Sequence, residues 1–572
     1  MNMAEGSTEA PSRPGAEVPP GSKSRACTQW GSPGTWEALP PPHKTRNEGS
    51  PGNRKPLACG GAFGCRRERT SERRSVPPSE GNEVRRDGRQ GIGASYSTGE
   101  AGEPTRWDPV EGRGRRIAER LRGMMPGTPR SETISTQQQT IATRAQQAPA
   151  LSFTSLNHHI DMAWLHEAYR RTRKDGAPGV DGQTAAAYAE HLEDNLQDLL
   201  DRAKSGRYRA PAVKRAYIPK GDGSTIRPIG VPTFEDKILQ RAVAMVLEPI
   251  YEQDFLDCSY GFRPGRSAHQ ALQVWRDQLM RFGGGWVIEL DVQRFFDTLD
   301  KAQLRAFVRH RVRDGVLLRL IGKWLNAGVL EDGAVWYPEA GTPQGGVISP
   351  LLANIFLHEV LDVWFEQDIK PRLKGWAVLI RYADDAVLGF SREEDARRVL
   401  AVLPKRFGKY GLSLHPEKTR LIDFRKPRET EPSDSSASRR RRTFDLLGFT
   451  HYWARSRRGY WVIKRKTATD RLSRAITGIG RWCRAHRHTP VSEQHRALAQ
   501  KLRGHYGYYG ITGNAQMLDH FLQAVKRRWH YWLNRRSQRG KWNWERFARV
   551  LRVRPLPPAV PVHSTWRHAA NP

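Results

Sequence analysis

The sequence is poor in cysteine and in long apolar runs, and both shortages exclude whole classes of protein. Its 572 residues include 5 cysteines, and none of them forms a Cys-x-x-Cys pair. A disulfide scaffold and a cysteine zinc site are therefore not expected. No apolar stretch approaches the ~18 residues of a membrane span, and the first residues lack the basic-then-apolar start of a secretory signal. We expect a protein of a reducing compartment with no membrane partner.

Acidic side chains are also few: 60 Asp and Glu oppose 94 Lys and Arg, a net charge of +34. The excess is uneven, at +7 over residues 1–150, +2 over 151–424 and +25 over 425–572. The last segment also holds eight of the 18 tryptophans, and aromatic rings among cations suit the bases and phosphates of nucleic acids. Contact with six phosphates would make binding weaken roughly 1000-fold between 50 and 200 mM salt. The alternative is a solvated basic face without a specific partner.

Local patterns divide the chain into a low-complexity start and a mixed helix and strand region. Residues 1–145 are rich in Gly, Pro, Ser and Arg without helical or strand periodicity, so we expect them to be disordered apart from an isolated helix near 113–125. Residues 207–233 alternate around a Gly-Asp-Gly turn and predict a hairpin. Residues 285–292 and 376–390 are apolar strands. The order of elements predicts a sheet with helices on one face.

Three acids in these apolar strands are the sharpest chemical feature. Asp384 and Asp385 interrupt 376–390, and Asp291 closes the apolar run 286–290. Burying a lone carboxylate costs several kcal/mol unless something compensates it. A tight turn would present both aspartates at one site, where hard oxygen ligands select Mg²⁺ or Mn²⁺. Two such ions ~3.5–4 Å apart serve in-line displacement at phosphorus. The alternative is a plain hairpin turn, which aspartate also favours.

The motif Tyr-Ala-Asp-Asp at 382–385 resembles that of the reverse transcriptases encoded by bacterial group II introns. The resemblance runs in order from about 156 to 555 and covers the N-terminal extension, fingers, palm and maturase (X) domain. Its other segments are DGAPGVDG (175–182), YIPKGDGSTIRPIGVPT (217–233), SYGFRPGRSAHQAL (259–272), ELDVQRFFDTLD (289–300), GTPQGGVISPLLANIFL (341–357), GLSLHPEKTRLI (411–422), LLGFTHY (446–452) and LRGHYGYYG (502–510).

The resemblance implies an α+β right-hand polymerase with fingers, an antiparallel-sheet palm and a helical thumb. The implied boundaries are 1–145 for the disordered extension, 150–206 for the helical extension of the fingers, 207–450 for fingers and palm, 451–555 for the basic thumb or maturase domain, and 556–572 for a C-terminal tail. Because paired cysteines and a His-Asn-His motif are missing after the thumb, we expect no endonuclease domain.

The resemblance also implies roles for single residues. Asp291, Asp384 and Asp385, with the Val292 carbonyl, would hold two Mg²⁺ ions, with Mn²⁺ as a substitute. Phe296 would be a steric gate against ribonucleotides, or else ordinary core beside its neighbour. The remaining nucleotide contacts would be Lys220, Arg227 and Gln344, with Lys418 as a candidate general acid. The basic residues expected to bind RNA are Arg439, Arg440, Arg441, Arg442, Arg503, Lys526, Arg527 and Arg528.

Asp300, three residues before Gln303, instead predicts a helix N-cap rather than a metal ligand.

The function implied is Mg²⁺-dependent, RNA-directed DNA synthesis, together with binding of the intron RNA as a maturase and mobility by target-primed reverse transcription. The implied partners are group II intron RNA, an RNA template with a DNA primer, target DNA and deoxynucleoside triphosphates, in the bacterial cytosol and at the nucleoid. Two alternatives stay open: an RNA-binding splicing cofactor with a vestigial polymerase site, and a domesticated or defence-associated reverse transcriptase.

Overall fold

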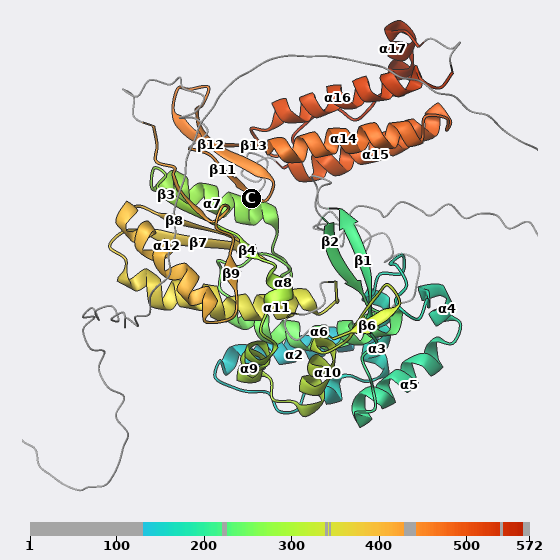
Figure 1. The fold of residues 1–572 in the computed structure, drawn as a ribbon, viewed down its shortest axis with the longest axis vertical. Helices are drawn as coiled ribbons and strands as arrows, with labels where there is room; N and C mark the ends of the chain where they lie inside the picture. The colour runs from blue at the N-terminus through green and yellow to red at the C-terminus, as the bar shows by residue number, and fades with distance from the viewer. Residues whose placement is uncertain are drawn as a thin grey trace, which may run out of the picture. The chain divides into compact units, whose positions relative to one another are not determined.

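The computed structural model combines helices and strands (Figure 1). The predicted helix near 113–125 lies outside the described residues. No helix in the described part of the chain is long and apolar enough to cross a membrane. The structure describes residues 130–219, 226–337, 341, 345–427, 442–537 and 542–563.

Helix α2 (Arg130–Gln147) lies largely within the segment that the sequence predicts to be disordered. Its buried Ile134 and Ile141 lie two turns apart, and the helix packs against α6. Gln138 Nε2 also donates to the Met245 carbonyl of α6 at 2.8 Å. The predicted disorder up to residue 145 is therefore wrong for this helix. Its apolar stripe is sparse in a polar segment and becomes visible only against its partner.

A group of helices follows and packs around the long, largely buried α6. The helical extension expected over 150–206 includes two separate helices after residue 183, because the backbone leaves the helical region at His191, with φ −127° and ψ 49°. Thr184 and Thr233 cap α4 and α6 through their side chains. The helices of this group are α3 (Met162–Arg171), α4 (Ala185–Ala189), α5 (Leu192–Ser205) and α6 (Phe234–Asp254), with a 3₁₀ turn η1 (Asn157–His159) before them.

The predicted hairpin within 207–233 is present. Strand β1 (Val213–Pro219) pairs antiparallel with β2 (Ile226–Val231). The first two residues of β1 also pair in parallel with β5 (Val329–Glu331), which pairs with β6 (Ala334–Trp336), so the sheet order is β2-β1-β5-β6. Along the chain, the helices that separate β2 from β5 are α6, α7 (Ala268–Arg281), α8 (Phe295–Thr298), α9 (Lys301–Arg311) and α10 (Gly315–Leu325). Asp300 caps α9 as predicted, accepting from two backbone N–H groups.

The central sheet has the strand order β10-β3-β8-β7 and is antiparallel throughout. Helices cover both of its faces, so the prediction of one covered face is wrong. Ile288 and Leu388 pack into the core that includes α12, whereas Val287 and Val387 pack into the core that includes α7. The strands are apolar at successive positions, which suits burial on both sides. The elements are β3 (Trp286–Leu290), β7 (Ala377–Tyr382), β8 (Asp385–Phe390), α12 (Glu393–Gly408) and β10 (Arg420–Asp423).

Short elements join this sheet to its surroundings. Strand β4 (Val292–Gln293) pairs with β9 (Ser413–Leu414) just beyond β3. Helix α11 (Ser349–Leu357) continues directly into a π-helix, η2 (His358–Ile369), and then into a 3₁₀ turn, η3 (Lys370–Arg372). The π-helix η2 contacts β7.

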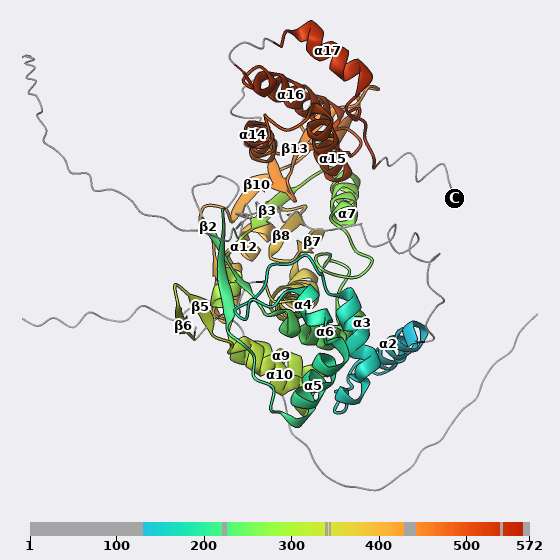
Figure 2. The ribbon, with the colours of Figure 1, turned by 90° about the vertical axis from the view of Figure 1, so that its right-hand side faces the viewer.

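The C-terminal part is a three-stranded sheet followed by helices. The predicted boundary at 451 falls inside β12, and the helices begin at Thr469. Phe444 and Ile463 of this sheet share a core with Trp275 of α7. Figures 1 and 2 both show α14, α15 and α16 side by side, and α16 contacts each of the other two. The elements are β11 (Phe444–Leu446), β12 (Phe449–Arg455), β13 (Trp461–Thr467), α14 (Thr469–Ala485), α15 (Val491–Tyr509), α16 (Ala515–Leu533) and α17 (Trp544–Val553).

The segment after α17 packs back onto these helices. Leu556 is buried in their core. The backbone N–H groups of Val562 and His563 donate to the Gly510 carbonyl at 2.7 and 2.8 Å. The part of the predicted tail that the structure describes is therefore fixed against α15.

Candidate active site

The two adjacent aspartates lie at the tip of the β7–β8 hairpin. Tyr382 pairs with Asp385, so the connecting turn is Ala383–Asp384. Ala383 adopts a left-handed conformation, with φ +57°, as such tight hairpin turns require. The predicted pair of strands with a tight turn is thus present, with Asp384 in the turn and Asp385 as the first residue of β8, so both carboxylates lie at one end of the central sheet.

Asp291 lies at the same end of the sheet. In the antiparallel register Leu290 of β3 pairs with Ala386 of β8. The residue directly after β3 is Asp291, and continuation of this register places it opposite Asp385, where side chains on a shared face lie close together. The Asp291 carbonyl accepts from the His415 backbone N–H at 2.8 Å. The fold thus brings Asp291 to the same end of the sheet as two adjacent acids that lie more than 90 positions further along the sequence.

The electrostatics of the site reflect this gathering. Burial, followed by the charges of Asp384 and Asp291, raises the pKa of Asp385 to about 7. Burial is also the main cause that raises the pKa of Asp384, and Asp291 adds to it. Both side chains still reach solvent, so an ion arriving from solution has access to them. Mutual repulsion of this kind is what a bound cation relieves.

The donor set of the site suits a hard divalent cation, because carboxylate oxygens are the ligands that Mg²⁺ prefers. In the arrangement observed, no three His, Cys, Asp or Glu side chains of the described residues are close enough together to hold an ion. Instead, the Lys418 ammonium lies 3.1 Å from Asp291 Oδ2. The predicted general acid is therefore at the site, where it neutralises one of the three carboxylates.

Of the predicted nucleotide contacts, Arg227 and Phe296 can be placed. Arg227 is exposed on β2. Its charge partly opposes the rise in the pKa of Asp384 and Asp385, so it lies within electrostatic range of both. Phe296 is half-buried in α8 and packs edge-to-face on Phe295, with ring centroids 5.2 Å apart. Val292 is buried in β4. Lys220 and Gln344 lie outside the described residues.

Three glycines bring backbone against backbone around the site. A Cβ on Gly261 would lie 2.4 Å from the Ala383 nitrogen. One on Gly345 would lie 2.4 Å from the Gly230 carbonyl oxygen of β2. A Cβ on Gly341 would lie 2.6 Å from the Phe296 and Asp297 carbonyl oxygens. Each separation is too short for any side chain, so only glycine allows these segments to meet.

Sequence reasoning missed two charged residues at the site. Arg471 of α14 lies near enough to Asp385 for its charge to lower the pKa of that carboxyl. Arg381, directly before the Tyr-Ala-Asp-Asp motif, is fully buried and donates to the Ala383 carbonyl. The signal for Arg381 was a charged residue within an apolar strand, the same signal that identified the aspartates. Nothing local to 471 distinguishes it from neighbouring arginines.

The predicted RNA-binding residues lie on several elements. Arg503 is exposed on α15, while Arg527 and Arg528 are exposed on α16 beside the half-buried Lys526. Arg442 is half-buried before β11. Arg439, Arg440 and Arg441 lie outside the described residues.

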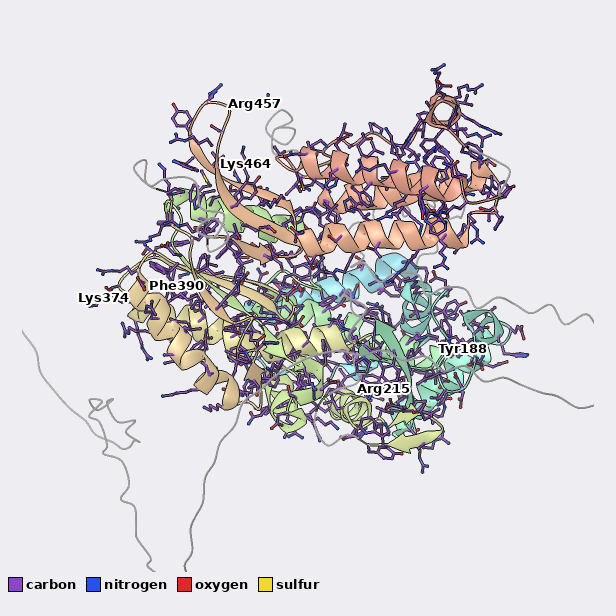
Figure 3. The ribbon with its side chains drawn as sticks, turned by 45° about the horizontal axis from the view of Figure 1, so that its top comes forward. Tyr188, Arg215, Lys374, Phe390, Arg457 and Lys464 are labelled. Atoms are coloured by element: carbon purple, nitrogen blue, oxygen red, sulfur yellow. The ribbon has the colours of Figure 1, made fainter. Side chains whose placement is uncertain are left out.

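The structure adds a basic hairpin to this set of charges. The β12–β13 turn carries the exposed Arg457, with Lys464 further along β13 (Figure 3). Most of the tryptophans in this part of the chain are packed, and Trp529 is entirely buried. Trp544 is exposed by 56% and stacks on His530 with centroids 4.0 Å apart. In the described part of the basic segment, many cations are therefore exposed, whereas most of the tryptophan rings are packed.

Comparison with known proteins identifies the class to which this fold and site belong. Residues 218–451 match the family described as reverse transcriptase (RNA-dependent DNA polymerase). The chain is 43% identical to protein YkfC of Escherichia coli over 287 residues, which are 45% of this chain and 75% of that protein. The chain thus belongs to a family of RNA-directed DNA polymerases.

Two further relatives indicate the branch of that family. Over 183 residues, 32% of this chain and 30% of the relative, the chain is 41% identical to the group II intron-encoded protein LtrA of Lactococcus lactis. It is 32% identical over 177 residues, 24% of each chain, to nuclear intron maturase 2 of Arabidopsis thaliana. The chain spans less than a third of the length of these two proteins. It belongs to the family of group II intron-encoded reverse transcriptases and maturases.

Proposed function

We propose that this chain copies an RNA template into DNA with Mg²⁺ held by Asp291, Asp384 and Asp385. The observation that carries the proposal is the presence of these acids together at one end of the central sheet, where burial, followed by the charges of Asp384 and Asp291, raises the pKa of Asp385 to about 7. When bound, the divalent ions would activate the primer hydroxyl and neutralise the departing pyrophosphate. The Val292 carbonyl is a further candidate ligand.

In this proposal the chain forms a right-hand polymerase. The palm is the central antiparallel sheet, the fingers include the β1–β2 hairpin, and the thumb is the helical part from α14 onward. Arg227 on the hairpin contacts the triphosphate of the incoming nucleotide, together with Lys220 and Gln344, and stabilises charge that shifts to the leaving group. Phe296 packs where a ribose 2′-hydroxyl would lie.

Lys418 has a specific role in the proposed reaction. Its ammonium pairs with Asp291 at 3.1 Å, which balances charge at the site before metal and nucleotide arrive. Once released from that carboxylate, the ammonium can donate a proton to the departing pyrophosphate. Removal of the Lys418 amine should therefore slow the chemical step more than it weakens nucleotide binding.

Primer extension on a poly(rA) template with an oligo(dT) primer tests the polymerase function. We expect Mg²⁺-dependent synthesis, with Mn²⁺ able to replace Mg²⁺, and we expect Asp384→Ala to abolish it. Asp300→Ala is the matched control, because this aspartate only caps α9. If the wild-type chain is inactive with both ions while it binds RNA tightly, the alternative of a splicing cofactor with a vestigial site is favoured.

We propose that the same chain binds its intron RNA as a maturase and supports intron mobility. Support comes from the net charge of +25 over residues 425–572 and from the exposed cations of the β12–β13 turn, α15 and α16. Binding energy directed to the folded intron would favour its splicing-competent form. The test is pull-down of the host intron RNA with a splicing time course at low Mg²⁺. Splicing that is unchanged by the protein would refute the maturase role.

A further inference from the structure

A buried arginine lies in β7, two residues before the Ala383–Asp384 turn, and all of its hydrogen-bond donors are used. Arg381 of β7 has no exposed surface. Its Nε and Nη2 atoms donate to the two carboxylate oxygens of Asp362 at 2.7 and 2.6 Å. Its other three bonds go to Ser259 Oγ at 2.7 Å, Asn354 Oδ1 at 2.9 Å and the Ala383 carbonyl at 3.0 Å. A guanidinium has five N–H groups, and here all five are satisfied.

The partners of Arg381 come from parts of the chain that are far apart in sequence. Asp362 lies on the π-helix η2 and is fully buried, so the two charges form an ion pair without access to water. Asn354 lies on α11, and its Nδ2 donates to the Gly261 carbonyl at 2.7 Å. The guanidinium thus connects η2, α11 and the 259–261 segment to one carbonyl of the turn.

The 259–261 segment holds the turn from a second side. The Arg381 backbone N–H donates to the Cys258 carbonyl at 2.7 Å, and the Tyr260 N–H donates to the Arg381 carbonyl at 2.9 Å. Gly261 then lies directly against the turn, at the 2.4 Å separation from the Ala383 nitrogen given above. Ala383 has a left-handed backbone conformation, which is uncommon for a residue other than glycine. The hydrogen bond from Arg381 to its carbonyl and the close approach of Gly261 to its nitrogen fix this conformation.

We propose that Arg381 is a positioning residue of the polymerase reaction, which sets the Ala383–Asp384 turn so that the Asp384 and Asp385 carboxylates are presented together. The inference rests on the proposed function, since it assigns a role within that reaction. Lysine at this position keeps the charge but cannot make the fork of two bonds to Asp362 while also reaching the turn carbonyl. The turn would then shift relative to β3, and a misplacement of about 1 Å costs on the order of 100-fold in rate.

The test compares Arg381→Lys with Arg311→Lys. Arg311 is a matched control because it is 7% exposed, pairs with Asp254 at 2.9 Å and donates four further bonds to backbone carbonyls, none of them at the site. We expect Arg381→Lys to lower kcat by about 100-fold and to raise the half-saturating Mg²⁺ concentration, with KM for primer and template within about threefold. Arg311→Lys should lower the melting temperature without the change in Mg²⁺ dependence.

A second pair of variants keeps the inference testable if Arg381→Lys does not fold. Gly261→Ala leaves the buried charges in place but pushes on the turn, and it should show the same fall in kcat and the same Mg²⁺ shift. Gly408→Ala is its control, because a Cβ there meets nothing within 4 Å. The inference is overturned if Gly261→Ala has wild-type kcat, or if a folded Arg381→Lys matches Arg311→Lys in both kcat and Mg²⁺ dependence.

An inactive wild-type chain would instead refute the proposed function. In that case amide exchange at 383–385 tests whether Arg381 holds the turn in place. Faster exchange in Arg381→Lys than in Arg311→Lys supports the positioning role, and equal exchange refutes it.

Discussion

Replacement of Asp236 by asparagine should change how the stability of the protein depends on pH. This carboxylate is buried in α6 and accepts hydrogen bonds from Tyr208 Oη at 2.5 Å, Trp324 Nε1 at 2.7 Å and Gln240 Nε2 at 2.9 Å. Burial outweighs these bonds and raises its pKa from 3.8 to about 6. The folded chain therefore holds this proton more tightly than the unfolded chain does.

The sign and the size of the effect follow from this shift. The contribution of the group to stability is fully present below about pH 4 and is lost as the pH rises through about 6. A shift of about two pKa units corresponds to about 3 kcal/mol. Asparagine cannot titrate, so the free energy of unfolding of Asp236→Asn minus that of the wild type should rise by about 3 kcal/mol between pH 4 and pH 7.

Urea denaturation of both proteins at a series of pH values, followed by tryptophan fluorescence, measures this difference. Taking the difference cancels the carboxylates of opposite behaviour, such as Glu167, whose arginine partners lower its pKa against the effect of burial. A difference that stays constant with pH, or that falls towards pH 7, would refute the reasoning.

Two further substitutions test other parts of the structure. Trp529→Ala removes a fully buried ring that packs edge-to-face on Phe547 and donates to Gln494 at 2.8 Å, so thermal unfolding should show a loss of about 3–5 kcal/mol; a loss below about 1 kcal/mol would contradict the assigned core. Phe296→Ala should reduce the preference for deoxynucleotides over ribonucleotides by roughly 10–200-fold, measured as a ratio of kcat/KM values, while Phe295→Ala should instead lower stability. Unchanged discrimination in Phe296→Ala would rule out the gate.

The sequence predicted those features that local pattern determines. The 376–390 hairpin, the hairpin within 207–233 and the Asp300 cap are all present, because turn chemistry and strand alternation act over a few residues. Asp384 and Asp385 could be identified as candidate site residues because carboxylates are costly to bury in apolar strands. The placement of Asp291 opposite Asp385 depends on the register of β3 with β8, which local sequence does not determine.

Features that rest on distant partners could not be predicted from the sequence. The partners of Arg381 lie 19, 27 and 122 positions away, so its buried charge shows no local compensation. Helix α2 is stabilised by α6 rather than by its own sparse apolar stripe. The second covered face of the central sheet and the packing of Leu556 are likewise products of tertiary contact.

The contacts of Gly261, Gly341 and Gly345 have a consequence for how such a site changes over evolutionary time. At each of these three points the nearest atom across the contact belongs to the main chain, so exchange of neighbouring side chains does not by itself alter that separation. Substrate preference and speed can then be retuned by exchanging residues that line the site, without rebuilding its frame. The cost is that one added methyl group at any of the three glycines would push the two backbone segments apart.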